Sequence, residues 1–199
     1  MKRIALLLPV LMLFVFACKK EKTNNTTGLS DFPLAVNNTW TYLVYDSIQQ
    51  TSQTAVFKIT GMYATNGGAV TYTTTTTTNG TVIDSGLIIN SGDTLLYQAN
   101  GQGLFSNLTL LFPLTVNNYW HTQYYSDSVF VAAANLNLSV LSNNYSNVFL
   151  VNRIESVPDL YIRQDVYIAP HVGIIQQNFN QGSWFLVNKS LRLVSYSLH

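Results

Sequence analysis

The sequence predicts an all-β protein, an antiparallel meander curled into a half-barrel, a barrel or a sandwich. Short runs of β-branched and aromatic residues recur about every ten residues, and polar turn residues separate them. No long stretch places apolar residues at the i, i+3, i+4 and i+7 spacing of an amphipathic helix. Regular strand spacing with short polar turns is typical of barrels and sandwiches built from consecutive strands.

A nine-residue phrase occurs twice and indicates two related halves. Residues 32–40 read FPLAVNNTW and residues 112–120 read FPLTVNNYW, identical at seven of nine positions with an offset of 80 residues. Proline cannot donate to a strand ladder and asparagine tolerates the left-handed conformation, so each copy predicts a turn that leads into a strand. We therefore expect one β-rich domain, 31–199, with an internal repeat formed by 32–111 and 112–199.

The clearest local signal is a hairpin at Asn79-Gly80, because both residues accept the positive φ of a type I′ turn between β-branched runs. Pairing outward from this turn predicts one threonine face and one apolar face, the latter formed by Val70, Tyr72, Ile83, Leu87 and Ile89. Further strands are expected at residues 40–49, 54–63, 94–99, 120–126, 129–140, 145–155, 160–169, 173–179 and 183–196. The apolar run 104–114 joins the halves and is compatible with a strand or a single helical turn.

The N-terminus reads as a signal peptide over residues 1–17. A positive start precedes an apolar run, residues 4–17, that is shorter than the ~20 residues a spanning helix needs. The run ends in Val-Phe-Ala before Cys18, which resembles a bacterial lipobox and implies a lipidated cysteine. Residues 18–30 then form a flexible polar linker that reaches ~20 Å from the membrane. Cys18 is the only cysteine, so no intramolecular disulfide and no cysteine zinc cluster can form.

The charge of the mature region argues against nucleic-acid binding. Removal of residues 1–17 takes away two of the ten basic residues and leaves eight against nine acidic ones, without the basic patch that nucleic acids require. Residues 41–150 hold only five charged side chains, so the surface there must consist of Thr, Ser, Asn and Gln, which is typical of envelope and extracellular β proteins. These five are Asp46, Lys58, Asp84, Asp93 and Asp127.

The phrase Phe-Pro-Leu-x-Val-x-Asn-x-Trp-x-Tyr over residues 32–42 resembles a signature of uncharacterised Bacteroidetes outer-membrane lipoproteins. Their usual form has glycine where this chain has Asn37 and Asn117. Residues 139–148 and 167–175 are similar to two later elements of that family. The resemblance implies an outer-membrane lipoprotein and carries no agreed activity. Its closing pattern is also similar to the curled sheets of lipoprotein-localisation factors, whose concave apolar face holds lipid.

Three aromatic residues in and beside the repeated phrase are candidates for a ligand groove: Trp40, Tyr42 and Trp120. Packing and turn formation are the alternative role for the repeated phrase, because a buried tryptophan has a large apolar body and an N–H group that needs an acceptor. The Asp-Ser and Asp-Thr pairs beside branched apolar residues resemble the acceptor sequence of Bacteroidetes O-glycosylation, with ordinary turn chemistry as the alternative. The resemblance would place sugar on Ser47, Thr94 or Ser128.

The polar residues form no recognisable catalytic or metal-binding pattern. The three histidines lack metal-ligand spacing and the serines lack catalytic motifs, so we expect no metal, no cofactor and no enzymatic activity. Arg153 with Glu155, and Arg163 with Asp165, share strand faces and predict cross-strand ion pairs, with an anion or substrate site as the alternative. The histidines are His121, His171 and His199.

Together these patterns predict a membrane-tethered lipoprotein of the outer membrane with a binding or scaffolding role. Its expected partners are the membrane, through the lipid anchor, and an apolar small molecule or another envelope protein. One alternative is a carrier of an acyl or other apolar ligand in a concave sheet, which requires a continuous cavity lined by tyrosines and tryptophans. The other is a glycan-acting hydrolase that uses Asp46, Asp84, Asp93 or Asp127.

Overall fold

A computed structural model describes residues 27–99, 104–105, 108–122, 127–157, 160–182 and 187–199. The described chain contains strands, turns and one 3₁₀ helix, and none of its helices is long and apolar enough to cross a bilayer. The elements are η1 (Leu29–Asp31), β1 (Thr39–Asp46), β2 (Thr51–Ala64), β3 (Val70–Thr78), β4 (Thr81–Ser91), β5 (Thr94–Ala99), β6 (Thr109–Leu111), β7 (Tyr119–His121), β8 (Ser128–Val140), β9 (Asn143–Val157), β10 (Leu160–Ala169), β11 (Gly173–Gln181) and β12 (Val187–Ser197).

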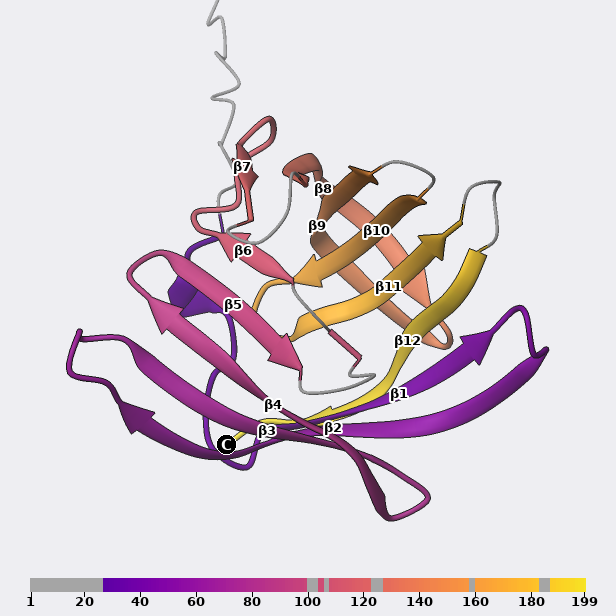
Figure 1. Cartoon of the computed structure of the whole chain (residues 1–199), viewed down its shortest axis with the longest axis horizontal. Coiled ribbons are helices and arrows are strands. Elements are labelled where there is room, and N and C mark those ends of the chain that lie inside the picture. Colours follow the sequence, from indigo (N-terminus) through magenta and orange to yellow (C-terminus); the bar gives the residue numbers. More distant parts are fainter. Residues whose placement is uncertain (1–26, 100–103, 106–107, 123–126, 158–159, 183–186) are drawn as a thin grey trace, which may run out of the picture.

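The predicted all-β antiparallel fold is confirmed, as a single sheet nearly closed into a barrel (Figure 1). The strand order is β6-β5-β4-β3-β2-β1-β12-β11-β10-β9-β8-β7, and every neighbouring pair is antiparallel. The first strand therefore pairs with the last, with Trp40 opposite Tyr196. Each half of the meander lies on one side of this central pair.

The edge strands β6 and β7 face the gap in the barrel and contain three residues each. Short edges offer little template for pairing with other chains. The indole N–H of Trp120 on β7 donates to the carbonyl of Thr109 on β6 at 3.1 Å. A side chain thus links the two edges where no ladder joins them.

The antiparallel order gives the barrel two distinct ends. Odd-numbered strands run from one end, here called the base, to the other end, called the mouth, and even-numbered strands run back. The segment Thr27–Asn38 crosses the base. It pairs with Leu114 at one side, and the carbonyl of Asp31 accepts the N–H of His171 in the β10–β11 turn at 2.7 Å. The buried ring of Phe32 meets Phe112 edge to face, so the N-terminal segment closes the base.

The two copies of the repeated phrase form the same turn. Asn37 and Asn117 have φ angles of 75° and 72°. The N–H of Asn37 donates to the carbonyl of Ile59 on β2 at 2.8 Å, and that of Asn117 donates to the carbonyl of Val131 on β8 at 3.0 Å. Asn38 and Asn118 each donate a side-chain N–H to the carbonyl of the proline five positions earlier, at 3.0 and 3.2 Å. The copies differ in the strand after the turn, because the first leads into the eight-residue central β1 and the second into the three-residue edge β7.

The hairpin turn lies at Asn79-Gly80 as predicted, but the predicted apolar face of β4 is wrong. The register shifts between Thr76 and Thr77, so Thr76 pairs with Asp84. Such a one-residue bulge moves every later side chain of one strand to the other face. The shift turns Ile88 inward and leaves Ile83 48% exposed. Of the predicted apolar face, Ile83 is exposed, Leu87 and Ile89 are half-buried, and Val70 is half-buried against the core, whereas Tyr72 is buried as expected.

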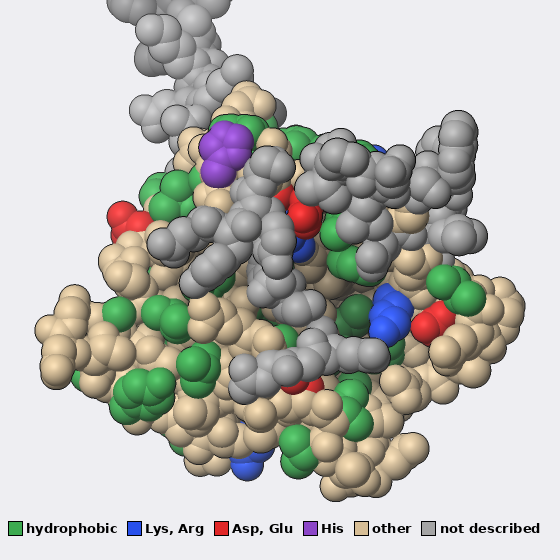
Figure 2. All heavy atoms as spheres, in the orientation of Figure 1, with side chains coloured by type: hydrophobic (Ala, Val, Ile, Leu, Met, Phe, Trp, Pro, Cys, Tyr) green, Lys and Arg blue, Asp and Glu red, His purple; other side chains and the backbone are tan. Residues whose placement is uncertain are grey.

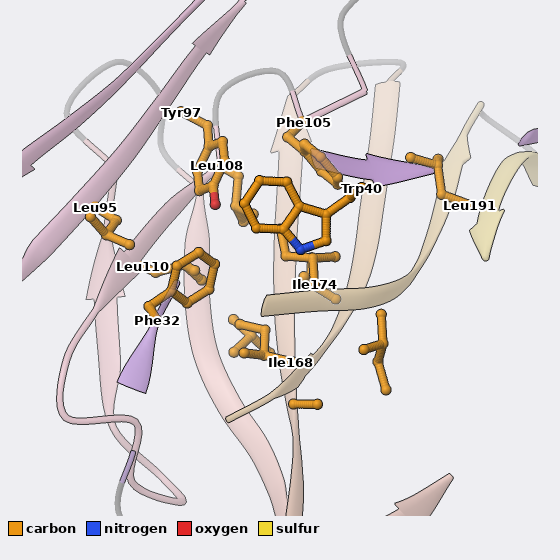
Figure 3. Packing of buried hydrophobic residues seen from close by; sticks show 14 of the residues in the cluster. Phe32, Trp40, Leu95, Tyr97, Phe105, Leu108, Leu110, Ile168, Ile174 and Leu191 are labelled. Carbon is orange, nitrogen blue, oxygen red and sulfur yellow. The ribbon is translucent and has the colours of Figure 1, made fainter. Parts of the chain in front are cut away.

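The core is continuous and rich in aromatic residues (Figure 3). Within the run 104–114, the segment Thr109–Leu111 forms β6, and Phe105 ahead of it lies inside the barrel. Its ring centroid lies 5.2 Å from that of Phe57, 5.5 Å from Tyr42 and 5.7 Å from Tyr97. Phe105 therefore fills the space between β1, β2 and β5.

Candidate functional site

A buried ionic cluster lies inside the mouth. Residues of β9 alternate inward as in any strand, which turns Arg153 and Glu155 toward the interior beyond the apolar Val151. Arg153 Nε donates to Asp127 Oδ2 at 2.6 Å and its Nη2 donates to Glu155 Oε2 at 2.9 Å. Arg153 is 5% exposed and Asp127 fully buried. We call Asp127, Arg153 and Glu155 the mouth triad.

The second oxygen of Asp127 binds the chain just beyond β7. Oδ1 accepts the backbone N–H of Thr122 at 3.1 Å and also its hydroxyl. Nδ1 of His121 lies 2.8 Å from the carbonyl oxygen of Asp127. The carboxylate of Asp127 thus accepts three hydrogen bonds, one from Arg153 Nε and two from Thr122. Removal of such charges from water costs several kcal/mol per ion, so the triad depends on these contacts.

Arg153 belongs to a row of inward-facing residues that runs across four strands. It pairs with Gln164 on β10, Gln164 pairs with Phe179 on β11, and Phe179 pairs with Lys189 on β12. Directly opposed residues point to the same face of a sheet. We call this row of Arg153, Gln164, Phe179 and Lys189 the mouth rung. Figure 2 shows acidic and basic side-chain atoms side by side in a recess of the viewed face.

Several buried acceptors near the mouth have no hydrogen-bond partner among the described residues. Gln164 Oε1, on a side chain 1% exposed, and Gln177 Oε1, on one 3% exposed, are the deepest of them. The others are Thr78 Oγ1 at the end of β3 and Asn180 Oδ1 near the end of β11. A buried acceptor without a donor costs about 1–3 kcal/mol, and native proteins contain few of them. Gln164 and Gln177 thus each have a buried amide oxygen that no described donor binds.

The aromatic residues singled out from the sequence lie in the core, where their polar atoms bind backbone carbonyls. Trp40 donates to the carbonyl of Val172 and Tyr42 to that of Ile174, each at 2.7 Å. Burial raises the pKa of Tyr42 well above its ordinary value. Trp40 and Tyr42 line a cavity of about 10 Å³, which holds about one water, and Trp120 does not line it. The two tryptophans therefore do not share this cavity.

A second cavity of about 10 Å³ lies beside Phe105 and is lined by Thr74, Thr76 and Asp84 among others. Phe105 lines both cavities. Neither is large enough for an acyl chain, so an apolar ligand could enter either cavity only if Phe105 left its place.

No protein-family model matches the sequence, and no curated protein matches it. Among solved structures, a "putative exported protein with YmcC-like fold" from Bacteroides fragilis aligns with a TM-score of 0.52 and 9% identity. The alignment covers 87% of this chain and 100% of that one. The chain has a YmcC-like fold. A "putative lipoprotein" from Parabacteroides distasonis aligns over the same shares at 9% identity, with a TM-score of 0.45.

Within the YmcC-like fold, the predicted modification sites lie apart from one another. Ser47 lies in the exposed β1–β2 turn, where the carboxylate of Asp46 accepts the N–H groups of the two residues after Ser47 at 2.9 Å. Thr94 begins β5 and is half-buried. The hydroxyl of Ser128 lies 2.7 Å from that of Tyr119. Cys18 lies outside the described residues.

The charged residues of the two halves do not converge on one site. Asp46 stabilises its own turn, whereas Asp127 is bound to Arg153. The predicted ion pairs exist, but each joins residues two apart on one strand, as in Arg163 with Asp165 at 2.9 Å, and not residues on two strands. Within the described ranges, no three His, Cys, Asp or Glu side chains group in a way that could hold a metal ion.

Sequence reasoning missed the mouth triad and the unpartnered glutamines. Asp127 and Arg153 are 26 positions apart and meet only through the β8–β9 pairing. A signal for the glutamines is present in the alternation of β10 and β11. Gln164 precedes Val166 and Ile168 at every second position, and Gln177 follows Ile175 in the same way. An amide in an otherwise apolar inward row indicates a polar interior.

Proposed function

We propose that the chain is a lipid-anchored protein of the bacterial cell envelope, located at the outer membrane, with a binding or scaffolding role and no enzymatic activity. Cys18 directly follows the apolar run 4–17 and supports the anchor. The phrase at residues 32–42 resembles that of uncharacterised Bacteroidetes lipoproteins. The Bacteroides fragilis protein of the same fold is named as exported, which supports an envelope location.

The position of Thr27 is the structural observation that favours a tethered binding protein. The backbone carbonyl of Thr27 accepts the N–H of Leu114 at 2.9 Å, so the linker joins the barrel at its base. A polar chain as long as residues 18–26 spans roughly 15–18 Å. A lipid on Cys18 would hold the base near the membrane and leave the mouth directed away from it. The fixed contacts of Asp127 suit a structural or binding role better than proton transfer.

Metabolic labelling with an alkyne-tagged palmitate tests the anchor. The wild-type chain should incorporate the label and sediment with outer membranes, because two or more acyl chains give stable membrane attachment. Cys18→Ser should lose the label and shift to the soluble fraction. Unlabelled wild-type protein, or a Cys18→Ser chain that still sediments with outer membranes, would contradict the proposal. Hydrolysis of any polysaccharide by the purified chain would contradict its non-enzymatic part.

A further inference from the structure

The hairpin of β8 and β9 projects from the base of the barrel. Ile168, the next-to-last residue of β10, pairs with Phe149, so residues 143–148 of β9 extend past the end of β10. The tip of this hairpin reaches β12, where the side-chain amide of Asn143 donates to the carbonyl of Val194 at 3.4 Å. The base therefore has a projecting tip that lies against the last strand.

Exposed apolar side chains gather where the tip meets the end of β12. Leu141 in the turn, Val194 and Tyr196 on β12, and Leu198 just beyond it are between 37% and 46% exposed. The half-buried Tyr145 on β9 joins them, since burial raises the pKa of its hydroxyl and the nearby Tyr196 raises it further. We call these five residues the base patch.

The two chain segments that form the base patch carry no charged side chain. Residues 128–152, which contain the hairpin, hold no Asp, Glu, Lys or Arg, and neither do residues 193–198. Charges leave water only at a high cost, so their absence allows these segments to enter an apolar medium. Tyrosine is enriched where membranes meet water, because its ring is apolar and its hydroxyl is polar. The composition of the base patch thus matches the interface of a bilayer.

Leu141 has a backbone conformation that a turn alone does not favour for leucine. Its φ of 53° lies in the left-handed region, where the Cβ of an L-residue is crowded. The other non-glycine residues that the structure describes at positive φ are seven Asn, Gln or His residues. Asparagine would suit this turn better, so the leucine side chain at the tip needs a reason outside the turn itself.

The linker brings a bilayer to this end of the barrel. Residues 18–26 separate Cys18 from Thr27 on the base and span roughly 15–18 Å. The segment Thr27–Asn38 crosses the base and ends beside the base patch, because the N–H of His199 donates to Asn38 Oδ1 at 2.7 Å, one residue after Leu198. A lipid on Cys18 would therefore keep a membrane within reach of the patch.

A second copy of the chain fits the base patch less well than a bilayer does. Five partly exposed side chains present roughly 300–400 Å², whereas each partner of a stable dimer buries ~800 Å². A bilayer requires no such area, since the anchor already holds the chain at the membrane.

We propose that the base patch inserts into the head-group and upper acyl region of the bilayer that holds the anchor. This inference rests on the lipid anchor proposed above and adds a second, direct contact with the same membrane. The barrel then rests on the bilayer through the β8–β9 tip and the end of β12, with its mouth turned away, and does not hang free on the linker.

Depth-dependent fluorescence quenching tests the inference on the full lipoprotein. Cys18 is the only cysteine, so Leu141→Cys adds a single free thiol for a fluorophore to a chain whose Cys18 is acylated. The labelled chain is reconstituted into vesicles of phosphatidylethanolamine and phosphatidylglycerol, with and without lipids that carry a nitroxide on the acyl chain. The nitroxide should lower the fluorescence at position 141 at least about twofold, because an interfacial apolar face is buried ~5–10 Å into the head-group and acyl boundary.

The matched control is Ile48→Cys in the β1–β2 turn at the mouth. Ile48 is 61% exposed, so its probe should be attached as readily and should not be quenched. A chain held by its linker alone would leave both probes in water. Absence of quenching at position 141, or equal quenching at both positions, would overturn the inference.

Polar variants separate membrane contact from folding. Leu141→Asn introduces a residue that tolerates the left-handed conformation, so its melting temperature should equal or exceed that of the wild type. Together with Val194→Thr, which keeps the shape of an exposed side chain, it should reduce the quenching of a probe on Leu198→Cys by at least about half. A lower melting temperature of Leu141→Asn would mean that the leucine serves the fold, and would overturn the assignment, as would unchanged quenching at position 198.

Light scattering of the lipoprotein in detergent tests the other occupant. Two chains per particle, with position 141 shielded from water but not quenched by the nitroxide, would assign the base patch to a second copy and overturn the inference. Palmitate labelling reports on the anchor alone. A labelled chain whose position 141 remains in water refutes this inference and leaves the anchor, whereas an unlabelled chain refutes both.

Discussion

Arg153→Met is expected to be among the most damaging single changes in the barrel. It leaves the fully buried Asp127 and the nearly buried Glu155 without a counter-charge. Breaking a buried ion pair from one side typically costs about 3–5 kcal/mol, because an uncompensated charge stays in the interior. Two carboxylates depend on this one guanidinium, so we expect the upper part of that range. Urea unfolding followed by circular dichroism measures the loss as a lower midpoint at unchanged slope.

A compensated variant distinguishes charge from packing. In the triple variant Asp127→Asn, Arg153→Met and Glu155→Gln, no charge remains, and the amide introduced at position 127 still offers an oxygen to the N–H of Thr122. Its stability should return to within about 1–2 kcal/mol of the wild type, since neutral replacements of buried ion groups are often tolerated.

The matched control is the same substitution on the neighbouring strand. Arg163 pairs with Asp165 at 2.9 Å but is 47% exposed, so Arg163→Met should cost less than about 1 kcal/mol. If Arg153→Met costs no more than Arg163→Met, the triad is accessible to water, and its structural role is refuted.

Three further outcomes are expected. Asn37→Gly should keep or raise stability, whereas Asn37→Ala should lower it by about 1–2 kcal/mol in urea unfolding, because φ is 75° there and only glycine adopts it freely. Phe105→Ala should cost about 3–5 kcal/mol and open a cavity that binds benzene by calorimetry, whereas Phe149→Ala, a control ring outside both small cavities, should not create this site. Burial raises the pKa of both Tyr42 and Tyr97. The stability that their neutral forms contribute is therefore fully present below pH ~10, the pKa of tyrosine in the unfolded chain, and is lost progressively as the pH rises above that value. The free energy of unfolding, measured with urea, should fall by about 1 kcal/mol per tyrosine between pH 10 and 11, and Tyr97→Phe should remove one such step.

Local sequence signals predicted the features that depend on neighbouring residues. The turn at Asn79-Gly80 and the two Asn-Asn turns form where the sequence places them, because positive φ is a property of the residues themselves. Strand spacing was enough to predict the sheet. It was not enough to predict that β1 pairs with β12 at the centre of the sheet, since that pairing joins the two ends of the chain.

The interior face of β4 and the mouth triad depend on register, which local patterns do not contain. Alternation from the turn assigned Ile83 and Leu87 to the core, and the bulge at Thr76 reversed the assignment. Likewise Asp127 looked like turn chemistry because its partner Arg153 lies on another strand. A pattern of charges within one strand cannot show which distant group will neutralise them.

The pairing of β1 with β12 also constrains the order in which the chain can fold. The N–H of His199 donates to Asn38 Oδ1 at 2.7 Å, a contact across 161 positions, and the C-terminus lies beside the base in Figure 1. High contact order slows folding, because the entropy of closing a long loop is lost before the contact forms. The central strand pair cannot assemble until residues 187–197 have been synthesised. Before that point β1 has an unpaired edge, so a chain truncated ahead of β12 should be a target for proteases and chaperones.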